Sequence, residues 1–575
     1  MEAMDIRSSL KESIAKSLSG LGIVVEADKV PLEYPAELKN GDYSSGVALQ
    51  YAKQAGTAPR ALAEKIVAAL GAVEGIAKIE VAGAGFINFY LAPAELAATI
   101  EKARAEDMPA RRSLGAGGWG SNTTQKGRTI IMEYTDPNPF KEFHIGHLVP
   151  NALGESVSRL FQFSGAMVKR ANYQGDVGIH VAKSIFILLE KNISEPTIAD
   201  LSAAYPEGSK RYEKDAAAKT AIDALNKKIY EKSDAKVNDL YEKGRKLSLE
   251  HFEEIYKVLG TKFDYYFFES AAGPIGVEIV RAHPEIFPES EGAVIFRGEE
   301  YGLHTRVFLN KQGLPTYEAK ELGLARLKED TCAFDLTMTI TGNEQGEYFK
   351  VVMKAMELAL PELRGKLAYK TNGMLRFAEG KMSSRTGNVI KGESLLADLT
   401  EAAKVRAAES RADNADILAQ QIAVAAIKYQ ILKQASGKDI IFDRKRALSL
   451  EGDSGPYLQY AHARAHQLVE KDSSEGVALR FPKGDALGIP ESANELARLL
   501  HRFPEAVEYA AAHSEPHLLT NYLLEFAAAF NSWYAQVHVL DGTPEQAHKV
   551  ALVDAVRRTL KNGLWVLGIP TPNKM

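Results

Sequence analysis

Apolar residues recur at two different spacings along the first part of the chain. A spacing of four near the start predicts an amphipathic helix, carried by Ile6, Leu10, Ile14 and Leu18. Two more helices are expected, one from about Ser44 and one over 62–70. Between Ile79 and Leu91 apolar and polar residues alternate, which is typical of a strand. These patterns predict an α+β domain over residues 1–112, followed by the glycine-rich linker 115–120.

The next part of the chain alternates strands with helices. The β-branched run 129–132 predicts a buried strand, and Pro137 and Pro139 prevent it from continuing. Helical spacing begins after His147, and a second strand is expected over 167–173. Further strands are expected over 293–296 and 336–341. Strand, helix and strand in this order imply a parallel, Rossmann-like sheet, and we expect that domain to span residues 122–395.

Two further segments have a purely helical pattern. Residues from about 191 to 262 are rich in lysine and glutamate, which predicts a solvated helical insertion in the sheet domain. From about residue 396 no strand pattern remains, and helices are expected to follow one another as far as Leu567. The fold class expected is therefore multidomain α/β, with an all-α bundle over residues 396–575.

Composition narrows the class of protein without identifying it. The chain has 575 residues, too many for one core, and a net charge of −5, so any RNA-binding surface must be a local basic patch. Cys332 is the single cysteine, which excludes internal disulfides and cysteine-rich zinc sites and fits a reducing, cytoplasmic location. No apolar run has the length of a membrane span, and the charged first residues do not form a signal peptide.

Two separate segments have the chemistry of a phosphate site. His144 and His147 lie where a strand is expected to end and a helix to begin, and Gly146 lets a ligand approach the backbone. A pair of capping or core histidines is the alternative. Far downstream, residues 380–388 form a glycine-flanked basic loop able to close on a polyphosphate, the alternative being an ordinary surface turn. The two together, in this order, favour a nucleotide site.

These segments resemble the two signatures of class I aminoacyl-tRNA synthetases. The HIGH signature is similar to residues 144–147, and the KMSK signature to Lys381, Met382, Ser383 and Ser384. Other segments resemble the arginyl-tRNA synthetase family in particular. They are Gly455–Arg464, Gly41–Ser44 with Val47–Leu49, and Gly85–Phe89. The resemblance covers nearly the whole chain, including its Met575 end.

The resemblance implies ATP-dependent activation of L-arginine to arginyl-adenylate, followed by transfer to the 3′-terminal adenosine of tRNA(Arg). The amino-acid carboxylate is already ionised, so its attack on the α-phosphorus needs alignment and positive charge instead of a general base. His144, His147, Lys381 and Lys141 are the expected catalytic residues. The first three, with Gly146 and the remaining KMSK residues, would bind ATP and its Mg²⁺; no zinc is expected. A monomer is expected.

An arginine substrate requires a pocket of carboxylates, because a guanidinium buried without partners is prohibitively costly. The resemblance places Glu133, Asn138, Glu269, Tyr317, Glu321 and Gln345 in that pocket. The family usually has aspartate where this chain has Glu321. Such a site can reject wrong amino acids by hydrogen bonding, so no editing domain is expected.

The resemblance also places tRNA-binding residues in the two flanking domains. Phe86 and Asn88 would face a D-loop base at the tRNA elbow, and packing of Phe86 in the core is the alternative. Tyr457, Tyr460, Arg464 and Met575 would face the anticodon loop, where splayed bases stack on rings and on a guanidinium.

Other functions remain open at this point. Another class I aminoacyl-tRNA synthetase is possible, and so is a small-molecule nucleotidylyltransferase, which shares His-x-Gly-His but needs no long helical domain. A catalytically silent tRNA-binding relative should have lost His144, His147 or Lys381, and this chain retains all of them.

Overall fold

The computed structural model describes residues 6–105, 117–378, 391–410, 412–474 and 494–575. The chain divides into two compact units. The first contains Met1–Asp107, Ala465–Phe503 and Glu525–Thr559, and the second contains Met108–Arg464, Pro504–Leu524 and Leu560–Met575. The boundaries expected from the sequence, 1–112, 122–395 and 396–575, remain a prediction.

The N-terminal residues of the first unit form a small sheet with helices. Its strands run antiparallel in the order β1-β3-β2, with bounds Tyr43–Ser45 (β1), Ile76–Ala82 (β2) and Phe86–Leu91 (β3). Its helices are α1 (Ile6–Gly20), α2 (Val47–Tyr51), α3 (Pro59–Leu70) and α4 (Pro93–Ala105). The expected apolar face of α1 is buried. The single strand expected over 79–91 is two strands, because the glycines between them allow the chain to turn.

The same unit contains a short helix from far along the chain, α17 (Asn494–His501). Arg498 Nε lies 2.5 Å from a carboxylate oxygen of the buried Asp42, and a second Arg498 nitrogen donates to the Leu38 carbonyl at 2.7 Å. Asp42 in turn accepts from the backbone of Leu91 at 2.8 Å. A buried carboxylate thus joins segments that are more than 400 positions apart in the sequence.

The second unit is built on a five-stranded parallel sheet in the order β11-β10-β4-β5-β6. The strands are β4 (Thr129–Glu133), β5 (Met167–Gln174), β6 (Tyr265–Phe268), β10 (Leu336–Gly342) and β11 (Leu367–Asn372). The order of connection reverses between β4 and β10, so the carboxyl ends of these two strands flank the crevice where such sheets bind ligands. The fold class expected from the sequence is confirmed.

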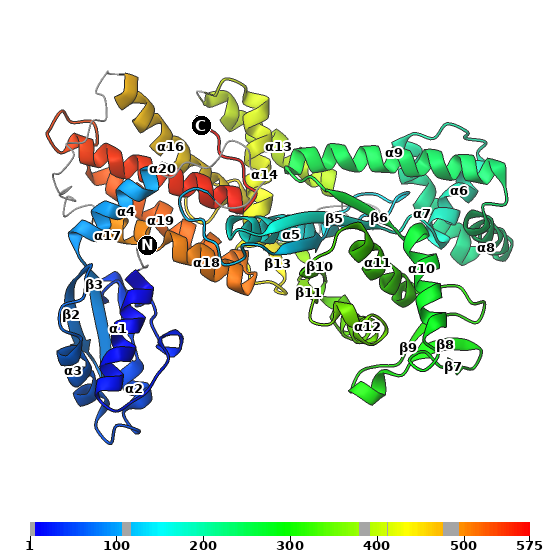
Figure 1. Ribbon diagram of the computed structural model, residues 1–575. Helices are drawn as coiled ribbons and strands as arrows, with labels where there is room; N and C mark the ends of the chain where they lie inside the picture. The colour runs from blue at the N-terminus through cyan, green and yellow to red at the C-terminus, as the bar shows by residue number, and fades with distance from the viewer. Residues whose placement is uncertain (1–5, 106–116, 379–390, 411, 475–493) are drawn as a thin grey trace. The chain divides into compact units, whose positions relative to one another are not determined.

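Helices that connect the strands of this sheet pack around it. They are α5 (Ile145–Phe163), α10 (Glu269–Ala282), α11 (Tyr317–Thr331) and α12 (Gly346–Ala359). Buried residues of α10, α11 and α12 form one core cluster with side chains of the sheet, including Ile131 and Ala171. Figure 1 shows α11 and α12 next to β10 and β11. The cluster holds α11 firmly beneath the carboxyl end of the sheet.

The expected insertion is helical. It contains α7 (Ile198–Lys214), α8 (Ala216–Glu231) and α9 (Ala235–Leu259), which gather with α6 (Ile179–Glu190) in Figure 1. Asp215 and Asp234 cap α8 and α9 by accepting hydrogen bonds from the first backbone N–H groups. The four helices enclose their own apolar core, with Ile185, Ile222 and Leu240 buried.

Shorter elements complete the second unit. An antiparallel sheet contains β7 (Glu289–Ser290), β8 (Ala293–Phe296) and β9 (Arg306–Leu309), so the expected strand 293–296 lies outside the parallel sheet. β12 (Leu375–Phe377) pairs in parallel with β13 (Ile440–Phe442). The expectation of no strand beyond residue 396 is therefore wrong. β13 spans three residues, too few to show a periodic pattern, and its partner lies more than 60 positions earlier.

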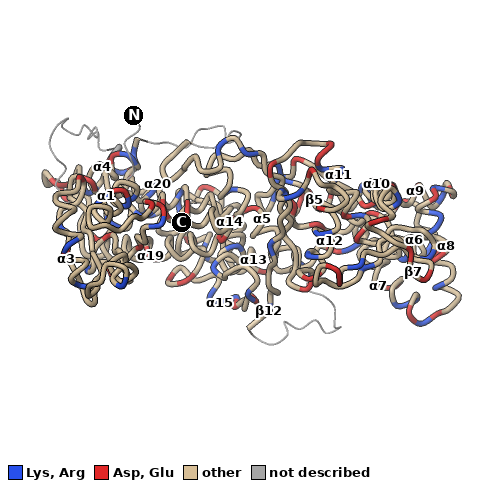
Figure 2. Tube along the Cα trace, turned by 60° about the horizontal axis from the view of Figure 1, so that its bottom comes forward, with Lys and Arg blue, Asp and Glu red and all other residues tan. Residues whose placement is uncertain are grey.

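The rest of the C-terminal region is helical, as expected. The helices are α13 (Gly392–Glu409), α14 (Ala415–Leu432), α15 (Arg444–Ala447), α16 (Gly455–Ser474), α18 (Phe503–His513), α19 (Pro516–Gln536) and α20 (Gln546–Val566). Figure 2 shows acidic and basic residues interspersed along the described chain instead of gathered on separate elements. This distribution agrees with the small net charge of −5.

Candidate functional site

The two histidines of the first signature lie at the start of α5. His144 has extended backbone and precedes the helix, and its N–H donates to His147 Nδ1 at 3.2 Å. The two imidazole rings stack with their centroids 3.8 Å apart. Because His147 Nδ1 accepts a hydrogen bond, the proton of its neutral ring must lie on Nε2. That N–H is left as a donor for a ligand at the helix N-terminus.

The electrostatic surroundings keep both histidines neutral. Burial lowers the pKa of His144, and the nearby Lys141 ammonium lowers it further. Burial lowers the pKa of His147 well below its ordinary value, with His144 and Lys141 adding to the effect. The lowered pKa values favour neutral imidazoles, which can still offer an N–H to a ligand. Lys141 is the cation that acts on both rings.

The connection between β4 and α5 is strained and tied down. Thr135, Asp136 and Phe140 have positive φ angles of 80°, 45° and 66°. Such backbone costs about 1–3 kcal/mol per residue and persists only where surrounding bonds hold it. Here Asp136 accepts from the Tyr173 N–H at 2.7 Å, and Asn138 accepts from the Gly175 N–H at 3.0 Å. Both donors come from the end of β5, so the connection is held against the edge of the sheet.

A buried ion cluster fixes α5 on its other side. Glu155 accepts from the Tyr134 hydroxyl at 2.6 Å and from Nε of Arg159 and Arg170 at 2.6 and 3.0 Å. Burial raises the pKa of Glu155, but the two guanidinium groups more than offset it and hold the pKa well below its usual range. The helix that positions His144 and His147 is thereby anchored to β4 and β5.

For the second signature, the structure describes only the residues that precede and follow it. Lys381, Met382, Ser383 and Ser384 lie outside the described residues. The first residues described after them pair with the first signature: the Gly392 N–H donates to the Phe143 carbonyl at 2.8 Å, and Lys391 forms a β-bridge with His144. The chain therefore returns to the histidine pair directly after the segment that contains the second signature.

The expected arginine pocket contains carboxylates with different partners. Glu133, at the end of β4, lies 2.5 Å from Lys328 Nζ, and Glu269, at the start of α10, accepts from Lys320 Nζ at 2.6 Å. Both lysines are buried residues of α11. Glu321, on the same helix, forms no hydrogen bond or ion pair with any residue that the structure describes. Of these three carboxylates, Glu321 is the one without a bonded partner in the described part of the chain.

The charge of Glu321 depends on its neighbours. Burial and, after it, the negative charge of Glu133 raise its pKa to about 8, although Lys328 opposes the shift. Burial and Glu133 also raise the pKa of Asp136 well above its ordinary value. Raised carboxyl pKa values indicate a pocket that lacks positive charge. A cationic side chain such as guanidinium would supply it.

The remaining residues expected in this pocket are more exposed. Tyr317 begins α11, four positions before Glu321 as expected, but is 68% exposed, with the Lys320 ammonium 5.4 Å from its ring centroid. Gln345 is exposed in the turn between β10 and α12. Asn138 Oδ1 and a Glu269 oxygen would lie 2.5 and 3.3 Å from a Cβ added at Gly175, so they border the same space. Direct contact of these residues with arginine stays a prediction.

The sequence did not single out several residues of this cluster. They are Asp136, Tyr173, Tyr348, Lys320 and Lys328. Burial raises the pKa values of Tyr173 and Tyr348 well above their ordinary range, and Glu269 and Glu321 are among the causes for both. The signal that could have found them is positional, because Tyr173 is the penultimate residue of a parallel strand and Tyr348 follows Gln345 by about one helical turn.

The expected tRNA-binding residues lie in different environments. Phe86 is 45% exposed at the start of β3, whereas Asn88 is buried and accepts from the Ser44 hydroxyl at 2.7 Å. Tyr457 and Tyr460 are half-buried on α16, and the Arg464 guanidinium lies 4.6 Å from the Tyr460 ring centroid. The contacts of all these residues with RNA stay predictions.

The C-terminal tail is held against α16 within the second unit. Gln459 donates to the Pro570 carbonyl at 2.9 Å, and His462 Nδ1 lies 3.1 Å from the Pro572 carbonyl. Met575 is half-buried at the end of this tail. These bonds bring the last residues of the chain to the helix that carries Tyr457 and Tyr460.

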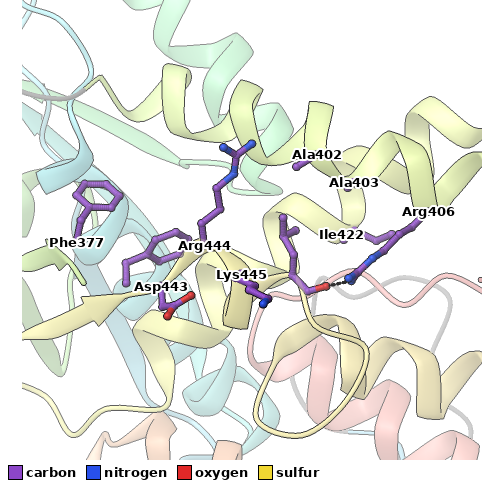
Figure 3. A pocket seen from close by; sticks show the side chains of 10 residues that line it. Phe377, Ala402, Ala403, Arg406, Ile422, Asp443, Arg444 and Lys445 are labelled. Atoms are coloured by element: carbon purple, nitrogen blue, oxygen red, sulfur yellow. Dashed lines mark hydrogen bonds between the residues drawn. The ribbon is translucent and has the colours of Figure 1, made fainter. Parts of the chain in front are cut away.

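Apart from the expected arginine pocket, a cavity lies between α13, α14 and the β12–β13 pair (Figure 3). Its floor is apolar, with Phe377, Ile422 and Phe442 among the lining residues. Its rim is basic: Arg406 and Arg444 donate to backbone carbonyls, whereas Lys445 has no bonded partner in the described part of the chain. An apolar floor with a cationic rim suits an anionic ligand that carries a flat ring.

Two searches of the described residues give negative results. No group of three or more His, Cys, Asp or Glu side chains in the described ranges is arranged to hold a metal ion. Across the same ranges, no helix is long and apolar enough to cross a membrane.

Comparison with known proteins first defines the class. Residues 113–444 match the family model described as tRNA synthetases class I (R), catalytic domain. The sheet order and the histidine pair at the N-terminus of α5 agree with this class I assignment. Residues 8–91 match the arginyl tRNA synthetase N terminal domain, and residues 458–575 match the DALR anticodon binding domain. The chain belongs to the arginyl-tRNA synthetase family.

Individual relatives agree with this assignment over the whole length. The arginine–tRNA ligase of Borrelia hermsii is 30% identical over 80% of this chain and 82% of its own length. That of Clostridium beijerinckii is 29% identical over 100% of both chains. Among solved structures, the arginyl-tRNA synthetase of Thermus thermophilus has a TM-score of 0.80 at 24% identity and covers 99% of both chains. That of Plasmodium falciparum has a TM-score of 0.79 at 19% identity and the same coverage. At these identities the structures support the fold.

Proposed function

We propose that this chain activates L-arginine with MgATP to form arginyl-adenylate and transfers the arginyl group to the 3′-terminal adenosine of tRNA(Arg). Arginine activation and tRNA charging are the activity of the family to which the chain belongs. The observation that carries the substrate assignment is Glu321, a half-buried carboxylate without a partner among the described residues. It lies in a cluster where other carboxylates are already paired with lysines.

In this proposal arginine enters with its guanidinium toward Glu321. The lysine partners of Glu133 and Glu269 leave Glu321 without a cationic partner, and its single charge when ionised matches the single positive charge of the arginine side chain. The α-carboxylate then points toward the carboxyl ends of β4 and β10, where Asn138 and Gln345 lie. Both amides would orient the backbone groups of the amino acid.

MgATP would bind across the N-terminus of α5. His144 and His147 donate neutral hydrogen bonds to phosphate oxygens, and the N-terminal N–H groups and Lys141 add positive charge. The substrate carboxylate attacks the α-phosphorus and pyrophosphate leaves. Lys381, expected beside the departing pyrophosphate, would stabilise its developing charge. No step requires a general base.

The tRNA would contact both terminal regions. Phe86 offers an exposed ring for an unpaired base, and α16 with the C-terminal tail offers Tyr457, Tyr460 and Met575. We propose the enzyme acts as a monomer in the cytoplasm. The alternative of a small-molecule nucleotidylyltransferase is disfavoured by the match to an anticodon binding domain over residues 458–575.

Amino-acid-dependent exchange of pyrophosphate into ATP tests the proposal. It is measured with each amino acid in turn, with and without tRNA. Arginine should give the highest exchange rate, and charging of tRNA(Arg) should follow in the complete reaction. Activation of a different amino acid would assign the enzyme another substrate. Nucleotide transfer to a small molecule without any effect of tRNA would favour the nucleotidylyltransferase.

A further inference from the structure

We propose that Tyr173 is a further arginine-binding residue, whose hydroxyl accepts a hydrogen bond from the substrate guanidinium and favours arginine over lysine. This inference rests on the proposed function. Tyr173 is the penultimate residue of β5, the strand paired with β4 in the parallel sheet. It therefore lies at the carboxyl edge where sheets of this type bind their ligands.

Hydrogen bonds of its backbone hold Tyr173 in position. Its N–H donates to Asp136 Oδ1 at 2.7 Å, and its residue pairs with Phe267 of β6. Its ring packs against the core cluster that contains Ile131 and Ala272. The ring therefore has an ordinary structural role, and the hydroxyl is the part that packing does not explain.

The hydroxyl lies within electrostatic range of the carboxylate pocket. The charges that act on it come from Glu269 on α10, Glu321 on α11 and Glu133 on β4, together with the Tyr348 hydroxyl on α12. These are the elements that surround the proposed guanidinium site. Burial and the three carboxylates raise the pKa of Tyr173, so the phenol stays protonated across the working pH range.

This hydroxyl is a buried polar group without a partner. Its oxygen is inaccessible to solvent and has no hydrogen bond to any residue that the structure describes. Buried hydroxyls in folded proteins nearly always have a hydrogen-bond partner, because leaving water without replacing its hydrogen bonds is unfavourable. A partnerless hydroxyl among carboxylates indicates that the missing partner is the ligand.

Guanidinium chemistry accounts for the pairing. A guanidinium presents five N–H donors in a rigid plane, whereas an ammonium presents three on one atom. The Glu321 carboxylate can accept two parallel N–H bonds, and the outer N–H groups then need other acceptors. A neutral phenol oxygen accepts one of them while its own O–H donates to a neighbouring carboxylate. The compact ammonium of lysine cannot reach both groups together.

The Tyr173→Phe variant separates this role from packing, because it keeps the ring and removes only the hydroxyl. The melting temperature should stay unchanged or rise, since an unpartnered buried group is removed. The arginine KM in pyrophosphate exchange should rise about 10- to 100-fold, the effect of losing a hydrogen bond to a charged group. The ATP KM should not change, and the preference for arginine over lysine should shrink.

Tyr429→Phe is the matched control. Tyr429 lies on α14, and its hydroxyl donates to Asp453 at 2.6 Å, so this variant should lower the melting temperature and leave the arginine KM unchanged. The proposal is overturned if Tyr173→Phe keeps the wild-type arginine KM, whatever its melting temperature. Absence of arginine-dependent exchange in the wild-type enzyme would instead refute the proposed function.

Discussion

The charge of Glu321 should make arginine binding depend on pH. The carboxyl pKa of about 8 means that only about one molecule in ten carries the ionised form at pH 7. Guanidinium pairs with the ionised form, so binding at pH 7 requires loss of a proton. An apparent dissociation constant is the intrinsic one divided by the competent fraction, which gives about a tenfold gain in affinity between pH 7 and pH 9.

The Glu321→Gln variant supplies the comparison. Truncating one partner of a buried charge pair costs about 2–5 kcal/mol, which corresponds to roughly 30-fold to several thousandfold in kcat/KM. At pH 7 the wild-type enzyme loses about 1.4 kcal/mol of this advantage to deprotonation, and at pH 9 almost none. The ratio of kcat/KM between wild type and variant should therefore grow about tenfold over this range. Glu321→Asp should retain measurable arginine activation.

Pyrophosphate exchange with arginine and lysine at pH 7, 8 and 9 measures these ratios. Titration of the substrate's own amino group affects all three proteins equally and cancels in the ratio. The reasoning would be refuted if kcat/KM for arginine had the same pH dependence in wild type and Glu321→Gln. It would also be refuted if the two proteins had equal kcat/KM on each amino acid. The specificity role would then pass to Glu269 or Glu133.

The raised pKa of Glu321 should also make the stability of the fold depend on pH. A carboxyl group whose pKa is raised by folding favours the protonated native state, so its contribution becomes less favourable as pH rises from its unfolded value toward 8. Glu321→Gln should therefore melt at a higher temperature than wild type at pH 9. The difference should shrink near pH 5, and thermal denaturation at both pH values checks the sign.

Three other variants test the remaining assignments. Lys381→Ala should lower kcat strongly with little change in arginine KM, because the lysine meets charge that develops on pyrophosphate; an effect on KM alone in steady-state exchange would contradict this. Replacing both Tyr457 and Tyr460 with alanine should weaken tRNA binding by about 1–3 kcal/mol per lost stack in a filter-binding assay, and normal affinity in a folded variant would favour a packing role. The basic rim of the Figure 3 cavity suits an anionic ligand such as an RNA backbone, and Lys445→Glu reverses one charge on that rim. The variant should raise the tRNA KM several-fold and leave arginine activation without tRNA intact, and an unchanged tRNA KM would exclude this cavity as an RNA contact.

Local sequence patterns were sufficient for the framework of the site. The run 129–132 and the alternation of strands with helices predicted the parallel sheet, and the two prolines predicted where β4 ends. Those signals depend on side-chain periodicity and on backbone restrictions of single residues. Side-chain periodicity and backbone restrictions both depend on residues that are close together in the sequence. For this reason β4, α5, β5 and β10 appear at the expected positions.

The lysines of α11 could not have been assigned in the same way. The segment from Tyr317 to Thr331 alternates charged and apolar residues and resembles a solvated helix face. In the structure Lys320 and Lys328 are buried, because Glu269 and Glu133 from other elements pair with them. Such burial depends on partners that are far away in the sequence. The unpartnered hydroxyl of Tyr173 is equally invisible without the fold.

The arrangement of α11 also gives a physical reason for selecting one cation. Two consecutive residues, Lys320 and Glu321, belong to the same turn, yet one neutralises a neighbouring carboxylate and the other leaves its own charge unmatched. Removing either lysine would add a second unmatched charge and favour water or metal ions over arginine. The lysines therefore define the charge that the pocket can accept, while Glu321 and the acceptors around it define its shape. A site that selects by both charge and donor geometry can discriminate by hydrogen bonding alone.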